Sequence, residues 1–185
     1  KKYTAYIGES TRQIEQYIKT LLEISKAELG YSLSKKPIDS KNFIDNIRSQ
    51  TAALAAAKKL TLDFEVHNLP KIFNADYNLL RRAILNIVSN AVEFSTENSK
   101  IIFNVKGMEN CIQFCVIDYG KGFSTNDIQQ AARQFYMGDK SRTSNAHYGM
   151  GLFITNSIAE QHDGKLSIAN STTTGGGMVT IEIPI

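Results

Sequence analysis

Hydrophobic residues at the start of the chain repeat with the period of a coiled coil. They fall at intervals of seven, and two more follow three residues later, which is the seam of one long helix in a coiled coil or bundle. The seam consists of Ile7, Ile14, Tyr17, Leu21 and Ile24. Gly30 ends the repeat, and the stretch 31–38, which contains Pro37, is predicted to be a linker. We therefore expect a helical unit over 1–30 and a second unit over 39–185.

Two helices and a strand are predicted at the start of the second unit. A helix is expected over about 39–60, and residues 62–66 alternate like a half-buried strand. The expected core face of this helix is Phe43, Ile44, Ile47, Ala53 and Leu54. Asp76 can cap a second helix over 76–94. Its apolar stripe is Leu79, Leu80, Ala83, Ile84, Ile87, Val88 and Ala91.

More strands and two shorter helices complete the pattern. Strands are expected at 101–106, 111–118, 165–169 and 178–185. Ser124 and Asp127 have the spacing of a capping box, which begins a short helix that ends near Phe135. The stretch 136–148 is polar and irregular, and a further helix is expected over 151–161. The order of elements predicts an α+β fold, with helices on one face of a mostly antiparallel sheet.

Composition narrows the class of protein. The 185 residues are 42% hydrophobic and 21% charged, which is typical of a globular chain. The net charge of +3 is uneven, because residues 1–60 carry 11 basic and 6 acidic side chains and the rest carry 10 and 12. No basic stripe is interleaved with aromatic residues, so a nucleic-acid partner is not expected.

The cysteines and the hydropathy favour a reducing compartment. Cys111 and Cys115 lie four residues apart in a predicted strand, about 13 Å, and cannot bond each other there. They are interpreted as buried free thiols of a cytoplasmic protein. No uncharged apolar stretch approaches the ~20 residues that cross a bilayer, so this piece is not expected to span a membrane.

Candidate chemistry begins on the helix over 76–94. Arg82, Asn86 and Asn90 lie one turn apart along the margin of the apolar stripe, with Glu93 beside them. An asparagine at such an edge often only bonds a neighbouring backbone group. Its amide oxygen is also a hard ligand that suits Mg²⁺.

Three glycine clusters allow close backbone approach or sharp turns. Asp118 leads the first, at the end of a strand, and the second opens a helix, where backbone N–H groups attract phosphate. The clusters are 118–122, 149–152 and 175–177, the last of which is interpreted as a hairpin turn. The dinucleotide fingerprint fails because Ile154 replaces its third glycine, and no P-loop occurs. The histidines His67, His147 and His162 are far apart, and each is interpreted as a surface or core residue.

Four motifs in order resemble the ATP-binding domain of bacterial sensor histidine kinases, in the GHKL superfamily. Residues 86–91, Asn-Ile-Val-Ser-Asn-Ala, are similar to its N box. The two glycine boxes correspond to 118–122 and 149–152, and Phe135-Tyr136 corresponds to the F box. The resemblance covers about 39–185 and implies a two-layer α/β sandwich of the Bergerat type. The helix over 1–30 is similar to the second helix of the family's dimerisation hairpin.

The resemblance also implies the ligands and their residues. ATP is the expected cofactor, with Asp118 accepting a hydrogen bond from the adenine amino group and Phe94 against the base. Asn90 is the expected Mg²⁺ ligand, supported by Asn86, which is the expected catalytic residue. A lid over 123–148 brings Lys140 and Arg142 to the phosphates. The remaining expected nucleotide-binding residues are Gly120, Gly122, Gly149, Gly151 and Leu152.

The implied activity is transfer of the γ-phosphate of ATP to a histidine, for relay to a response regulator. Superfamily hydrolases have a glutamate base where this chain has Asn86, and an amide cannot take a proton from water at neutral pH. The family's acceptor motif is missing, because Gly164 follows His162-Asp163. The acceptor is therefore expected on a helix absent from this chain, within a homodimer formed through the N-terminal helix. The implied location is the cytoplasmic portion of a membrane-anchored bacterial receptor.

Departures from the family pattern keep alternatives open. Glu93, Ala132 and Met137 stand where the family often has a basic residue, a phenylalanine and an arginine, respectively. They motivate a degenerate dimerisation module with an impaired nucleotide site. A GHKL ATPase is the other alternative, and a serine-directed kinase is disfavoured by the leading helix.

Overall fold

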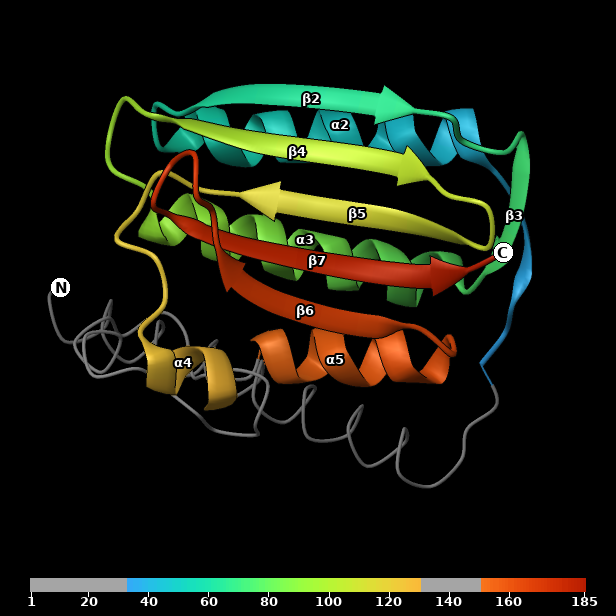
Figure 1. Ribbon diagram of the computed structural model, residues 1–185. Coiled ribbons are helices and arrows are strands. Elements are labelled where there is room, and N and C mark those ends of the chain that lie inside the picture. Colours follow the sequence, from blue (N-terminus) through green and yellow to red (C-terminus); the bar gives the residue numbers. More distant parts are fainter. Residues whose placement is uncertain (1–32, 131–150) are drawn as a thin grey trace, which may run out of the picture. The chain divides into compact units, whose positions relative to one another are not determined.

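The computed structural model describes residues 33–130 and 151–185, which Figure 1 draws in colour. The chain divides into two units at Leu33–Ser34, and the second unit is the subject below. The coiled-coil helix, the F box and three predicted site residues lie outside the described residues. Those three are Lys140, Arg142 and Gly149.

A five-stranded sheet forms one layer of the second unit. Its strand order is β2-β4-β5-β7-β6, in which β2 and β4 are parallel and the other pairs are antiparallel. The strands are β2 (Thr61–His67), β4 (Lys100–Gly107), β5 (Cys111–Ile117), β6 (Lys165–Asn170) and β7 (Gly177–Pro184). This arrangement agrees with the predicted mostly antiparallel sheet.

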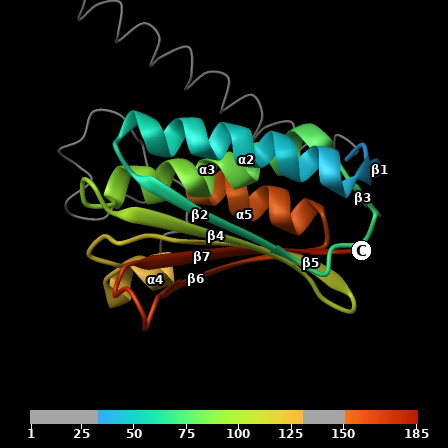
Figure 2. The same ribbon diagram turned by 90° about the horizontal axis from the view of Figure 1, so that it is seen from above.

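Three helices form the second layer, on one face of this sheet. They are α2 (Ser40–Ala57), α3 (Tyr77–Phe94) and α5 (Gly151–Gln161), and Figure 2 shows them together on one side of the strands. The short helix α4 (Thr125–Gln130) follows β5. Ser124 and Asp127 exchange hydrogen bonds of 2.8 and 3.1 Å, so the predicted capping box is confirmed. Because α2, α3 and α5 lie on one face of the sheet, the two-layer α+β fold is as predicted.

The core lies between the two layers. The predicted stripe of α3 faces it, because six of its seven residues are buried and Leu79 packs against them partly buried. Alternate residues of β4 and β5 point inward, as the period of a strand requires. The ring of Phe43 makes edge contacts with Phe73, Tyr77 and Phe114 at centroid distances of 5.3 to 6.3 Å. These contacts join α2, α3 and β5 into one core.

The predicted linker contains a strand, which is a correction. β1 (Lys36–Asp39) pairs antiparallel with β3 (Ile72–Ala75), which was not predicted either. Each strand has only four residues, and neither Lys-Pro-Ile-Asp nor Ile-Phe-Asn-Ala alternates between apolar and polar residues. Pro37 fits because β1 pairs on one side only, and proline is tolerated on an edge strand.

The predicted core face of α2 is wrong at its C-terminal end. Ala53 and Leu54 are exposed, and the buried row continues instead through Thr51 and Ala55. The buried row follows steps of four residues, which rotate slowly around the helix axis. The hydrophobic pattern of the sequence did not reveal this row, because threonine is not counted as apolar.

The cysteines are free but only half-buried, so the predicted unbonded thiols are confirmed and their full burial is not. Burial raises the pKa of the Cys115 thiol. Among the described helices, none combines the length and hydropathy needed to cross a bilayer.

Candidate functional site

Asp118 follows β5 directly and is buried, with 7% of its surface exposed. Its Oδ1 accepts hydrogen bonds from the backbone N–H of Gly120 at 2.7 Å and of Gly177 at 3.0 Å. Burial raises the pKa of the carboxyl group, and these two hydrogen bonds act in the opposite direction. No described residue donates a hydrogen bond to Oδ2. The carboxylate therefore has one fixed oxygen and one oxygen available to a ligand.

The turn between β6 and β7 supports Asp118 from the other side. The hydroxyl of Thr174 donates to the Asp118 carbonyl at 2.9 Å and accepts from the Gly176 N–H at 3.1 Å. A Cβ on Gly177 would lie 2.7 Å from Asp118 Oδ2 and 2.8 Å from the Phe123 ring, so only glycine fits there. Gly176 and Gly177 of the cluster 175–177, which was predicted as a hairpin turn, therefore also belong to the Asp118 site.

The first glycine box lies against the end of α3. A Cβ on Gly120 would lie 2.4 Å from the carbonyl oxygen of Phe94, and the Thr96 hydroxyl donates to the Tyr119 carbonyl at 2.7 Å. The Phe94 side chain is 42% exposed. The structure therefore brings the loop after Asp118 and the end of α3 together and leaves an exposed aromatic residue at that end.

The far end of the same loop is fixed by Asn170. Its side chain accepts from the Phe123 N–H at 2.6 Å and donates to the Phe123 carbonyl at 2.8 Å. Gly122 has φ of +72°, which favours glycine. Asn170 and Thr174 were not predicted from the sequence, in which their only signal is the loop composition around the third glycine cluster.

Lysine and serine side chains cap the C-terminus of α3. Lys58 Nζ donates to the carbonyl of Val92 at 2.7 Å and to the carbonyl of Glu93, and the Ser95 hydroxyl donates to the Ala91 carbonyl at 2.7 Å. A cation at this end is favourable because the last carbonyls of a helix carry partial negative charge. The position of Phe94 is therefore supported from α2, which sequence reasoning did not find.

Asn86 and Asn90 face the start of α5. Asn86 Nδ2 donates to the Gly151 carbonyl at 3.4 Å. A Cβ on Gly151 would lie 3.7 Å from Asn90 Nδ2 and 3.8 Å from Asn90 Oδ1. No described residue hydrogen-bonds the Asn90 amide. The structure thus brings three predicted site residues together and leaves the Asn90 oxygen available.

Thr155 links the two helices beside these residues. Its hydroxyl lies 2.8 Å from the Gly151 carbonyl and 3.4 Å from the Ala83 carbonyl of α3. Leu152, also predicted at the site, is half-buried and packs against the core. Arg82, which the sequence placed in line with Asn86, is half-buried, and burial lowers the pKa of its guanidinium.

The donor set fits Mg²⁺ held mainly by a ligand rather than by the protein. Among residues 33–130 and 151–185, no group of three or more His, Cys, Asp or Glu side chains is arranged to hold a metal ion. Mg²⁺ usually keeps several waters and shares the phosphates of a substrate, so it needs only one or two protein oxygens. The unbonded amide oxygen of Asn90 meets that requirement.

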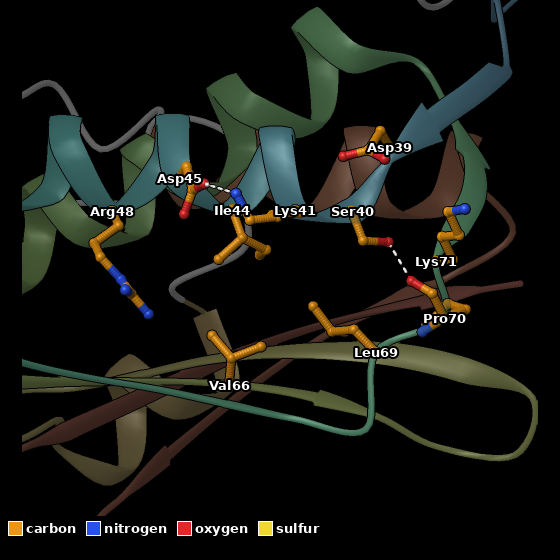
Figure 3. A pocket seen from close by; sticks show the side chains of 10 residues that line it. All are labelled: Asp39, Ser40, Lys41, Ile44, Asp45, Arg48, Val66, Leu69, Pro70 and Lys71. Atoms are coloured by element: carbon orange, nitrogen blue, oxygen red, sulfur yellow. Dashed lines mark hydrogen bonds and ion pairs between the residues drawn. The ribbon is translucent and has the colours of Figure 1, made fainter.

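A separate groove lies on the α2 side of the domain. It has a volume of about 440 Å³, and Figure 3 shows that its lining comes from Asp39 and α2 on one side and from β2 and the loop after it, up to Lys71, on the other. Apolar side chains, among them Ile44 and Val66, are surrounded by charged ones, including Arg48 and Lys71. None of the predicted site residues within 33–130 and 151–185 lines this groove.

Comparison with known proteins agrees with the geometry. The sequence profile of the family described as histidine kinase-, DNA gyrase B-, and HSP90-like ATPase matches residues 75–185. The sensor histidine kinase SpaK of Bacillus subtilis is 37% identical over 186 residues, 100% of this chain and 40% of SpaK. The aerobic respiration control sensor protein ArcB homolog of Haemophilus influenzae is 30% identical over 78% of this chain and 49% of that protein. The chain thus spans less than half the length of these relatives.

Solved structures share the fold. Full-length ShkA, crystallised in complex with AMPPNP, gives a TM-score of 0.79 at 21% identity, over 95% of this chain and 36% of that one. The catalytic domain of histidine kinase ThkA gives 0.71 at 22% identity, over 82% of this chain and 95% of that domain. The sandwich inferred from the motifs is therefore a known architecture.

Proposed function

Because the chain belongs to the histidine kinase-, DNA gyrase B- and HSP90-like ATPase family, we propose that it is the ATP-binding catalytic part of a sensor histidine kinase. It binds ATP with Mg²⁺ and transfers the γ-phosphate to a histidine side chain on a helix of the same receptor. The named relatives are sensor proteins of this kind.

The proposal rests on the carboxylate of Asp118, in which Oδ1 is hydrogen-bonded within the domain and Oδ2 is available to a ligand. Its Oδ1 is held by two backbone N–H groups, so Oδ2 has a fixed position and accepts a hydrogen bond from outside. An adenine amino group is a matching donor. Guanine presents a carbonyl oxygen at the same position, so a fixed acceptor selects adenine. Phe94, exposed at the adjacent end of α3, covers the base.

The phosphates would lie along the facing surfaces of α3 and α5. Asn90 supplies the Mg²⁺ ligand and Asn86 holds the start of α5 beside it through Gly151. The backbone N–H of Gly151 donates to a phosphate oxygen, as helix N-termini do. Lys140, Arg142 and Gly149 would add further contacts from outside the described residues. Bound Mg²⁺ would neutralise phosphate charge.

The phosphate acceptor is not a described histidine of the core. His162 is fully buried with both ring nitrogens hydrogen-bonded, so its imidazole cannot reach a γ-phosphate. We place the acceptor on a helix of the dimerisation hairpin, in a homodimer formed through the N-terminal helix. A response regulator would then receive the phosphate, and the domain would work on the cytoplasmic side of a membrane-anchored receptor.

Calorimetry of the folded chain tests the nucleotide site. Mg-ATP should bind, and Asp118→Asn should weaken it about tenfold to a hundredfold, since the amide places a donor where the amino group needs an acceptor. Asp63→Asn, the same change at an exposed strand position, is the matched control and should not alter affinity. Absence of Mg-ATP binding, or equal binding of Mg-GTP, contradicts the proposal.

A hydrolase is the second candidate within the family. It predicts ATP turnover without any protein acceptor, and Asn86 opposes it because an amide is not a general base for water. Labelled phosphate on an added histidine-bearing helical hairpin, with negligible turnover in its absence, separates the kinase from the hydrolase. Transfer would also exclude the degenerate module.

A further inference from the structure

His162 is a fully buried histidine placed where α5 ends and α3 begins. It follows the last residue of α5, and the chain then turns through Asp163, whose φ is +62°. The ring lies against Asp76, the N-cap of α3. Figure 1 shows that α3 starts and α5 ends on the same side of the domain, opposite the start of α5. The ring is therefore remote from Asn86, Asn90 and Gly151.

The hydrogen bonds of this ring assign its tautomer. Nε2 lies 3.0 Å from the backbone nitrogen of Asp76, which is a donor, so Nε2 must accept. Nδ1 lies 2.8 Å from the Ile158 carbonyl, which accepts, so Nδ1 carries the proton. The ring is thus neutral, and one of its two bonds crosses from α5 to α3.

Charged groups around the ring do not change this assignment. Asp76 uses Oδ1 to cap Asn78 and Leu79, and Lys35 Nζ contacts Asp163 Oδ2 at 2.7 Å. Burial lowers the pKa of His162, and Lys35 acts in the same direction. The hydrogen bond to the Ile158 carbonyl raises the pKa, as do Asp76 and Asp163, without outweighing burial. The neutral ring is therefore the stable form near neutral pH.

Three polar contacts follow one antiparallel register between α3 and α5. His162 meets Asp76, Thr155 meets Ala83, and at the other end Gly151 meets Asn86. From the first to the second contact, the residue number rises by seven along α3 and falls by seven along α5, which is about 10 Å of helix on each side. A slide of α5 along α3 breaks all three contacts together.

We propose that His162 is a positioning residue for nucleotide binding, because its bond to the Asp76 N–H fixes the register that holds Gly151 beside Asn86 and Asn90. The inference rests on the proposed function, in which these residues face the phosphates. His162 thus acts on the nucleotide site through its hydrogen bond between α5 and α3, and it does not touch the ligand.

Two substitutions separate the crossing bond from the local one. In His162→Gln, the amide oxygen occupies the place of Nε2 and still accepts from Asp76. In His162→Asn, the amide nitrogen occupies the place of Nδ1, keeps the bond to Ile158 and leaves the Asp76 N–H without an acceptor. We expect the Kd for Mg-ATP to rise about fivefold to tenfold in the Asn variant and less than about threefold in the Gln variant.

A second measurement needs no nucleotide. In ¹⁵N NMR spectra of the free chain, the Gly151 amide and the Asn86 side-chain amide should shift in the Asn variant and stay near their wild-type positions in the Gln variant. If wild-type chain does not bind Mg-ATP, the proposed function fails while these signals still test the register.

Other outcomes overturn the positioning role. Equal losses of affinity in both folded variants would indicate general packing, and unchanged signals at Gly151 and Asn86 would indicate a purely local role. If the Asn variant does not fold, the same signals are compared in His162→Gln and in His162→Leu, whose apolar side chain fills the buried space and offers the Asp76 N–H no acceptor. A shift in the Leu variant only supports the proposal, and equal behaviour of the two variants contradicts it.

Discussion

The two sides of the proposed nucleotide site are held in different ways. The sheet wall, formed by 118–123 and the turn 171–177, is fixed by a dense set of backbone hydrogen bonds and by glycines without room for a side chain. The helix wall, formed by the facing sides of α3 and α5, is joined by packing and by three spaced polar contacts.

This difference separates recognition of the base from handling of the phosphates. A wall fixed by its own backbone keeps one acceptor in place before the ligand arrives, which favours selectivity. A wall that depends on the register of two helices can be adjusted from a distance. We therefore expect substitutions in the sheet wall to act locally and strongly, and those around the helix wall to act through helix position.

The largest effect is expected from Gly177→Ala in the sheet wall. The new methyl group meets Asp118 Oδ2 and the Phe123 ring, so affinity for Mg-ATP should fall at least about tenfold and the free energy of unfolding by about 1–3 kcal/mol. Calorimetry and urea titration measure the two. Gly175→Asn is the control, because a Cβ there meets nothing within 4 Å and asparagine tolerates its φ of +72°. Wild-type affinity in Gly177→Ala would contradict a preformed wall.

The next effect is expected at the C-terminus of α3. Lys58→Met removes the ammonium that bonds the last carbonyls, and the free energy of unfolding should fall by about 1 kcal/mol. The neighbouring exposed Lys59→Met is the matched control and should leave stability unchanged within error. Equal urea midpoints for both variants would show that the cap does not hold α3.

Acidification should weaken the helix wall by a smaller amount. The pKa of His162 is lowered in the folded chain, so the unfolded chain binds the extra proton first and stability falls as pH drops through about 6.5. The loss from this one group stays under about 1 kcal/mol at pH 6. Urea titrations of wild type and His162→Gln should diverge below pH 6.5; parallel curves would contradict the buried neutral ring.

The smallest effect is expected on the open face of the sheet. Lys165 pairs with Glu182 at 2.9 Å, but the lysine is exposed, and such pairs contribute little because solvent screens them. Lys165→Met should change neither the urea midpoint nor the affinity for Mg-ATP. A measurable loss of affinity would mean that both faces of the sheet influence the site.

The local sequence pattern predicts the main site residues but not the groups that hold them in place. Asn86 and Asn90 were predicted as neighbours because the turn of a helix brings every fourth residue to one side, and the strand pattern placed Asp118 at a strand end. Neither pattern contains the partners that hold them. Thr174 and Asn170 lie more than 45 residues from the groups they bond, and Lys58 lies 34 residues from Val92.

The sequence by itself determined the helices α3 and α5, the strands of the main sheet, the family and the order of its motifs, because hydrophobic periodicity and caps are local properties. The tertiary structure alone decided that β1 pairs with β3, that the buried row of α2 runs through Thr51 and Ala55, and that His162 joins α5 to α3. These outcomes depend on which distant groups meet once the sheet and helices pack, and burial and hydrogen bonding are satisfied only then.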